Sequence, residues 1–208
     1  MSEKLKTAVI YYSSTGNNFQ LAQWAAESAE NEGAEVRIRK AKELVHESVI
    51  ATNPAWKKNF DATRDIQEVS LDDLDWAEVV IFSVLTRYGN VPSQMKQFMD
   101  STGPLWSQGK LTNKVVTAMT SAMNLHGGQE STLLSLYTTM YHWGAIVVTP
   151  GYTDPLLYAS GGNPYGLSVS VDGEGKMKEE RDVIKKAVYY QAKRAVSIGR
   201  LIAGKSDS

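Results

Sequence analysis

The feature that most constrains the fold of this chain is the alternation of short apolar runs with segments of helical periodicity. Strands that alternate with helices in this way predict one parallel, doubly wound α/β sheet with helices on both faces and right-handed crossovers. We expect five strands, at residues 8–12, 35–39, 79–84, 114–119 and 145–148. We expect helices at residues 18–31, 70–74, 93–100, 130–141 and 179–203.

Two segments of the chain are less regular. Residues 41–77 contain the helix-breaking pair Asn53-Pro54, and only the capped helix at residues 70–74 is expected within them. Residues 150–175 form a stretch rich in Gly, Tyr and Pro that is longer than most connections, so we interpret it as functional or interfacial. Because no repeat or domain linker interrupts the pattern, residues 1–208 should form a single domain with an inserted loop at about residues 150–178.

A polar segment lies directly between the first expected strand and the first expected helix. Its backbone N–H groups, its hydroxyls and the positive end of the helix would form an anion site. It contains no Lys or Arg, which excludes the phosphate loop of nucleoside triphosphatases, and it lacks the three-glycine dinucleotide fingerprint. Two interpretations remain: the loop with which flavodoxin-like proteins hold the phosphate of FMN, and an ordinary turn with a helix N-cap. The segment consists of Ser13, Ser14, Thr15, Gly16, Asn17 and Asn18.

Two further loops with distinctive residues follow the third and fourth expected strands. A flavodoxin-like strand order of 2-1-3-4-5 would place all three loops side by side, at the edge where such sheets bind ligands. A Tyr-Gly-Asn turn in the second loop would let backbone approach a planar ring closely, although a simple turn with a solvated Arg87 explains the same residues. The second loop comprises Leu85, Thr86, Arg87, Tyr88, Gly89 and Asn90, and the third comprises Ser121, Ala122, Met123, Asn124, Leu125, His126 and Gly127.

The composition narrows the chemistry that the chain can perform. A net charge of -1 over 208 residues disfavours nucleic acid or an anionic membrane as a partner. The absence of cysteine excludes disulfides and thiol redox chemistry, so any redox activity needs a cofactor to carry the electrons. No Ser-His-Asp order, HExxH pair or acidic cluster indicates hydrolysis or a metal site. The polar N-terminus and the lack of a long apolar run predict a cytoplasmic protein without membrane insertion.

Several motifs together resemble one known family. Residues 86–90 read Thr-Arg-Tyr-Gly-Asn, and they are followed by Gln-Met-Lys-Gln-Phe-Met-Asp at 94–100 and Gly-Pro-Leu-Trp at 103–106. Gly-Gly-Gln-Glu at 127–130 and Gly-Gly-Asn-Pro-Tyr-Gly at 161–166 come next in the same order. Over most of its length the chain resembles the WrbA (tryptophan-repressor-binding protein) family of flavodoxin-like NAD(P)H:quinone oxidoreductases.

The resemblance implies an FMN-dependent enzyme that takes a hydride from NADH or NADPH and passes two electrons to a quinone by ping-pong kinetics. The first loop would hold the FMN phosphate, and the second and third loops would line the flavin, largely through backbone. His142 would reach the flavin edge. Trp106 would stack on the quinone or the nicotinamide, either in its own subunit or in a neighbouring one. The family resemblance also implies a homotetramer, which the large aromatic residues outside regular elements favour as interface anchors.

This chain departs from the family pattern at three places. Its third loop has few hydroxyls, which favours backbone contacts to the cofactor over side-chain contacts. Leu85 replaces the usual proline, and Thr15 stands where many members have an aromatic residue implicated in nicotinamide stacking. The alternative interpretation is a flavodoxin-type electron carrier or a non-enzymatic FMN-binding regulatory protein. Such carriers are usually strongly acidic, and a net charge of -1 disfavours this interpretation.

Overall fold

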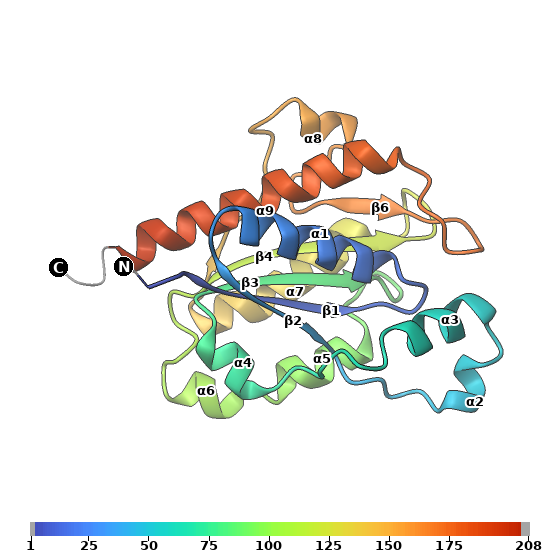
Figure 1. Cartoon of the computed structure of the whole chain (residues 1–208), viewed down its shortest axis with the longest axis horizontal. Coiled ribbons are helices and arrows are strands. Elements are labelled where there is room, and N and C mark those ends of the chain that lie inside the picture. Colours follow the sequence, from blue (N-terminus) through green and yellow to red (C-terminus); the bar gives the residue numbers. More distant parts are fainter. Residues whose placement is uncertain (1–2, 205–208) are drawn as a thin grey trace.

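The computed structural model describes residues 3–204 and contains the expected parallel sheet (Figure 1). Its strands pair in parallel in the order β2-β1-β3-β4-β5, which confirms the predicted flavodoxin-like order. The register aligns Tyr12 with Val84 and Leu85 with Ser121, so the central strands reach the same carboxyl edge. The bounds are β1 (Lys6–Tyr12), β2 (Glu35–Lys40), β3 (Val79–Leu85), β4 (Val115–Ala122) and β5 (Ile146–Val147).

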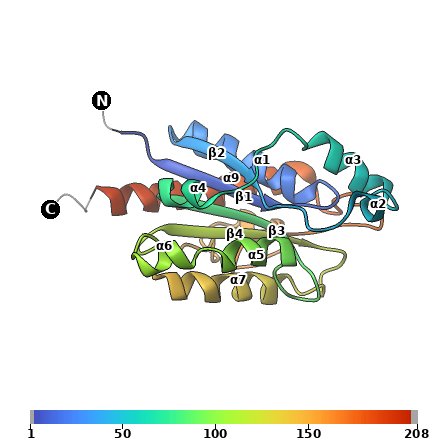
Figure 2. The same cartoon turned by 90° about the horizontal axis from the view of Figure 1, so that it is seen from below.

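Helices cover both faces of this sheet (Figure 2). The central strands β1, β3 and β4 are almost entirely buried, as strands covered on both sides must be. One face packs against α1 (Asn17–Asn31) and α9 (Arg181–Ala203). The other face packs against α4 (Leu71–Trp76), α5 (Ser93–Asp100), α6 (Gly103–Ser107) and α7 (Gln129–Trp143). Among the residues that the structure describes, no helix is both long and apolar enough to cross a membrane.

The expectation of an uninterrupted loop over residues 150–175 is wrong. This segment contains a short helix, α8 (Leu156–Ala159), and a sixth strand, β6 (Ser168–Ser170). β5 pairs only with the start of β4, whereas β6 pairs in parallel with its end, from Thr120 to Ala122. The inserted segment therefore leaves the sheet after β5 and returns to the same side of β4. At the point of return, a Cβ on Gly166 would collide with the carbonyl oxygen of Ala118, so this close approach requires glycine.

The segment between β2 and α4 is more regular than the sequence indicates. It forms α2 (Glu47–Ile50) and α3 (Pro54–Ala62), both beside the carboxyl ends of the strands (Figure 1). The pair that looks like a break begins α3, because Asn53 Oδ1 accepts a hydrogen bond from Trp56 N and Pro54 occupies the first turn. The capped helix expected at residues 70–74 is confirmed as α4, with a reciprocal capping box between Ser70 and Asp73.

Candidate cofactor site

A cavity of about 910 Å³ lies at the carboxyl edge of the sheet and is lined by all three predicted loops. Its volume falls within the range of about 300–1,000 Å³ that is usual for ligand pockets. Of the predicted site residues, those that line it are Ser13, Ser14, Thr15, Asn18, Leu85, Thr86, Arg87, Tyr88, Ser121, Ala122, Met123, Asn124 and Gly127. Those outside its lining are Gly16, Asn17, Gly89, Asn90, Leu125, His126, Trp106 and His142.

The first loop presents the open N-terminus of α1 to this cavity. Gly16 is the N-cap in a left-handed conformation (φ 96°), and no side chain within the described residues caps the helix there. Ser13 Oγ accepts a hydrogen bond from the Gly16 N–H at 3.0 Å and so shapes the turn. The first N–H groups of α1 have no acceptor within the helix, and a bound anion would satisfy them.

A buried hydrogen-bond cluster fixes this loop to the neighbouring strands. Asn18 Oδ1 accepts a hydrogen bond from Ser121 Oγ at 2.6 Å, and its amide Nδ2 donates to Ser83 Oγ at 3.3 Å. Ser83 Oγ in turn donates to the Asn18 carbonyl at 2.8 Å. These contacts join the first turn of α1 to the ends of β3 and β4, so Asn18 and Ser121 act mainly as supports of the site.

The second loop brings a positive charge to the first. The sequence shows no cation within residues 13–18, but Arg87 Nη2 lies 3.2 Å from Ser14 Oγ. Paired backbone hydrogen bonds between Arg87 and Asn90, each 2.9 Å, close the turn, with Tyr88 at its fully exposed tip. A cation contributed by another loop therefore complements the open helix end.

The third loop meets the second at a pair of glycines. A Cβ added to Gly128 would lie 2.5 Å from Gly89 Cα, so the two backbones approach as closely as their lack of side chains allows. The third loop itself is braced by Gln129 Nε2, which donates to the Asn124 carbonyl at 2.9 Å. Met123 and Leu125 are exposed at its rim. This loop, which has few hydroxyls, lines the cavity with Ser121, Ala122, Met123, Asn124 and Gly127, and backbone contacts to the cofactor stay a prediction.

Two walls of the cavity are not among the residues predicted from the sequence. A hairpin formed by residues 171–177 contributes Val171, Asp172, Gly173 and Gly175, and α3 with its cap contributes Asn53 and Trp56. Asn17 Nδ2 holds the hairpin by donating to the Gly175 carbonyl at 2.6 Å. A Cβ on Gly175 would lie 2.7 Å from Thr15 Cβ, so a small side chain at position 15 fits beneath the hairpin. The Asn53-Pro54 pair is the sequence signal that could have revealed α3.

Tyr12, at the end of β1, donates from its hydroxyl to Glu43 Oε2 at 3.0 Å. Burial, followed by the negative charge of Glu43, raises the pKa of Tyr12 far above its usual value. Gln94 Nε2 donates to the other oxygen of Glu43 at 2.8 Å. Tyr12 therefore remains a neutral hydrogen-bond donor at any physiological pH and supports the first loop from behind.

The sequence also matches known proteins. The profile of the NADPH-dependent FMN reductase family matches residues 5–153. The chain belongs to this family. A relative in Deinococcus radiodurans named NAD(P)H dehydrogenase (quinone) is 46% identical over 204 residues, which cover 98% of this chain and 100% of that protein. A protein of the same name in Sinorhizobium fredii is 36% identical over 202 residues, covering 95% of this chain and 98% of the other.

Solved structures agree with this membership of the FMN reductase family at the level of the fold. A WrbA-like flavodoxin from Agrobacterium tumefaciens superposes with a TM-score of 0.63 at 22% identity, covering 94% of this chain and 97% of that one. A flavodoxin from the domain Archaea gives a TM-score of 0.59 at 17% identity, covering 96% and 99%. The flavodoxin-like fold is thereby confirmed. Together with the family profile and the NAD(P)H dehydrogenase (quinone) relatives, these findings confirm the resemblance to the WrbA family.

The residues of this family member suit the parts of FMN. The uncapped end of α1, the Ser14 hydroxyl and the Arg87 guanidinium form a donor set for a phosphate. The second and third loops provide a closely packed backbone wall and an apolar rim for a planar ring. The cavity has room for both parts. FMN therefore fits the site on its chemistry and its size.

Trp106 and His142 lie together, but not at this cavity. Trp106 Nε1 donates to the His142 carbonyl at 2.9 Å, and both side chains are exposed. α7 begins at Gln129 beside the cavity, and a helical rise of 1.5 Å per residue carries His142 about 20 Å away. α6, which carries Trp106, lies at the opposite end of the sheet from α3 (Figure 1). Within a single chain, His142 therefore lies outside the cavity, and its approach to the flavin edge stays a prediction.

Proposed function

We propose that this protein is an FMN-dependent NAD(P)H:quinone oxidoreductase. The observation that carries the proposal is the cavity built from all three predicted loops, with Arg87 beside Ser14 at the open end of α1. Family membership and the relatives named NAD(P)H dehydrogenase (quinone) support it. When bound, FMN supplies the transfer of a hydride from the nicotinamide and of two electrons to the quinone.

The residues of the chain provide binding, orientation and a stable electrostatic environment. The N-terminus of α1, Ser14 and Arg87 hold the phosphate. The turn around Tyr88 and the backbone of residues 122–124 orient the ring at the mouth of the cavity, where a second planar molecule can reach it. Tyr88 and Met123 are exposed at this mouth and exclude water from an arriving substrate. One open face serves both substrates in turn, which requires ping-pong kinetics.

We further propose that Trp106 and His142 act from a neighbouring subunit of a homotetramer. The two residues are exposed, the Trp106 side chain is hydrogen-bonded to the backbone of His142, and both lie far from the cavity of their own chain. In a neighbour's site, Trp106 offers a flat apolar surface to a quinone or nicotinamide, and His142 can relay a proton or steady developing negative charge. The dependence on nicotinamide dinucleotides is consistent with the expected cytoplasmic location.

Steady-state kinetics test the proposed activity. The FMN-loaded protein should reduce a benzoquinone with NADH or NADPH and give parallel lines in double-reciprocal plots. Intersecting lines would keep the enzyme but exclude a single shared site. A holoprotein that can be photoreduced but oxidises neither nicotinamide with any quinone would instead support the electron carrier. Release of FAD, or of no flavin after incubation with FMN, would overturn the proposal.

A further inference from the structure

Helix α3 is placed at the cavity without being part of the apolar core. None of its residues, all of which the structure describes, is buried. Its aromatic side chains Trp56 and Phe60 are only half-buried. Trp56 lines the large cavity beside Ser13 and also borders a smaller cavity of about 130 Å³ behind it, whereas Phe60 borders the smaller one alone. An indole in this position borders both spaces and contributes apolar surface to the lining of the large cavity.

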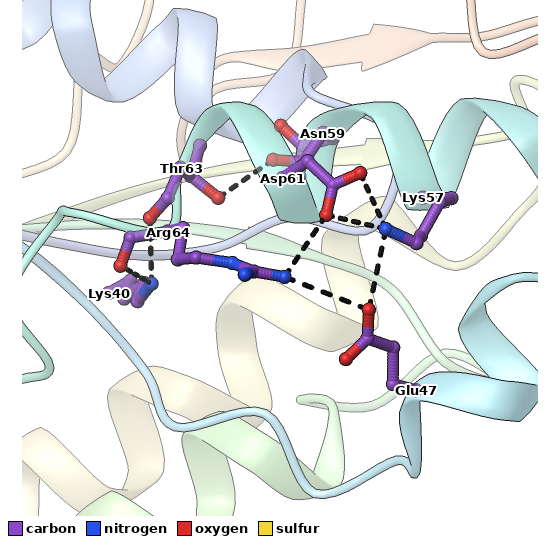
Figure 3. A network of polar contacts seen from close by, with 7 residues as sticks. All are labelled: Lys40, Glu47, Lys57, Asn59, Asp61, Thr63 and Arg64. Atoms are coloured by element: carbon purple, nitrogen blue, oxygen red, sulfur yellow. Dashed lines mark hydrogen bonds and ion pairs between the residues drawn. The ribbon is translucent and has the colours of Figure 1, made fainter.

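Polar contacts hold α3 at its C-terminal end (Figure 3) and also attach it to the first loop. Lys40 Nζ donates to the carbonyls of Thr63 and Arg64 at 2.7 and 3.1 Å, where the helix ends. Asn59 Nδ2 donates to the Ser13 carbonyl at 2.8 Å and so attaches the helix directly to the first loop. These contacts fix α3 beside the cavity without burial of its indole.

An ion-pair network joins α3 to α2 on the outer side (Figure 3). Lys57 Nζ lies 3.4 Å from Glu47 Oε1 and 2.6 Å from Asp61 Oδ2, and Arg64 Nη2 lies 3.7 Å from the same Glu47 oxygen. Exposed pairs of this kind are individually weak, but a network restricts the orientation of a helix. Lys57 and Asp61 do not line the large cavity, whereas Trp56 is the large apolar side chain of α3 that does.

We propose that Trp56 is a binding residue for FMN, and that its indole packs against the isoalloxazine ring. A flat, electron-rich indole suits a planar, electron-poor ring better than it suits the phosphate or the ribityl chain. The order of the strands places α3 on the β2 side of the site and the third loop on the β4 side, so the two close the cavity from opposite sides. The inference rests on the proposed function, because it concerns the same cofactor.

Titration of FMN into the apoprotein tests this inference. Trp56→Ala should weaken FMN binding by up to about tenfold, the loss expected for an aromatic pair. Trp56→Phe should keep most of the affinity. In both variants the fluorescence of bound FMN should rise, because an indole in contact with a flavin quenches it by electron transfer and a phenyl ring does so poorly. Trp76→Phe is the matched control. Trp76 lies in α4, its ring packs against the guanidinium of Arg37, and it does not line the cavity.

The outcomes separate this inference from the proposed function. In one outcome, wild-type protein and Trp76→Phe bind FMN, and both Trp56 variants match them in affinity and in flavin fluorescence. Trp56 is then not a binding residue, and the proposed function stands. If wild-type protein does not bind FMN, the proposed function and this inference both fail. If Trp56→Ala does not fold by circular dichroism, the flavin fluorescence of Trp56→Phe decides: a rise supports the contact and no change overturns it.

Discussion

The guanidinium of Arg87 reaches the first loop from the end of a different strand. Its Nη2 atom lies 3.2 Å from Ser14 Oγ, although the two residues are separated by 73 positions in the sequence. The sequence alone indicates a phosphate loop without a cation, and the tertiary structure supplies one. A positive charge there should act on the phosphate of FMN first, and on the flavin ring less.

Replacing Arg87 therefore distinguishes the contribution of the FMN phosphate to binding from that of the flavin ring. Arg87→Ala should weaken FMN binding about tenfold through loss of a charge-assisted hydrogen bond to phosphate. Binding of riboflavin, which lacks the phosphate, should be unchanged. Calorimetric titration of both ligands measures the difference, with Lys96→Ala on the exposed side of α5 as the control for net charge. An equal loss for both ligands would show that Arg87 acts on the ring instead.

At the level of elements, the clearest successes of sequence analysis are those set by local patterns. The apolar runs of β1, β3 and β4 and the capping signal at Ser70 predict their elements because burial and capping depend on neighbouring residues. β6 has only three residues, and its pairing with β4 depends on the close approach at Gly166, which no local pattern reveals. The sequence also does not predict that α3 lines the cavity, because polar contacts to Lys40 and Ser13, which are distant in the sequence, position this helix.

The capping box of α4 gives a test of stability at this level. Burial opposes ionisation of Asp73, but hydrogen bonds from Ser70 and Arg39 outweigh it and hold the pKa of Asp73 below its usual value. Because the folded pKa is lowered, this stabilisation is complete above the unfolded pKa of about 3.9 and is lost as the pH falls through the folded value. Asp73→Asn should cost about 2–3 kcal/mol at pH 7.

Urea unfolding of the apoprotein between pH 7 and pH 3 measures this contribution. The difference in unfolding free energy between wild-type protein and Asp73→Asn should shrink as the pH falls below about 4. Asp72→Asn, at the exposed neighbouring position in the same helical turn, serves as the control. A difference that stays constant across this range would mean that the charge of Asp73 contributes nothing.

For the whole molecule, the feature that matters is the separation of the cofactor cavity from Trp106 and His142. The cofactor cavity lies at the carboxyl edge of the sheet, and Trp106 and His142 lie together at the far end of α7. Sequence motifs singled out both sets of residues but could not reveal the distance between them, because that distance is set by the length and direction of α7 in the folded chain. A catalytic role for Trp106 and His142 therefore requires a second copy of the chain.

Mixed oligomers test that requirement directly. Gly16→Val should not bind FMN, because valine is strained at a φ of 96°, but it retains Trp106 and His142. The double variant Trp106→Ala/His142→Ala should bind FMN and reduce quinone about 100-fold more slowly. Mixed oligomers formed by refolding both variants together should recover activity to within about tenfold of wild type. In them, the Gly16→Val chain supplies Trp106 and His142 to the FMN site of the double variant.

The control partner in this experiment carries all three substitutions, Gly16→Val, Trp106→Ala and His142→Ala. It therefore lacks the two side chains that the double variant needs. Mixtures with it should show only the activity of the double variant. Native mass spectrometry confirms that mixed oligomers have formed and counts their subunits, for which we expect four. If mixed oligomers form and recover no more activity than the control mixture, Trp106 and His142 do not act in a neighbouring site. Light scattering could instead find only monomers at micromolar concentration while the wild-type protein is active. A second copy of the chain is then not needed for activity, and the catalytic residues must lie at the mouth of the cavity.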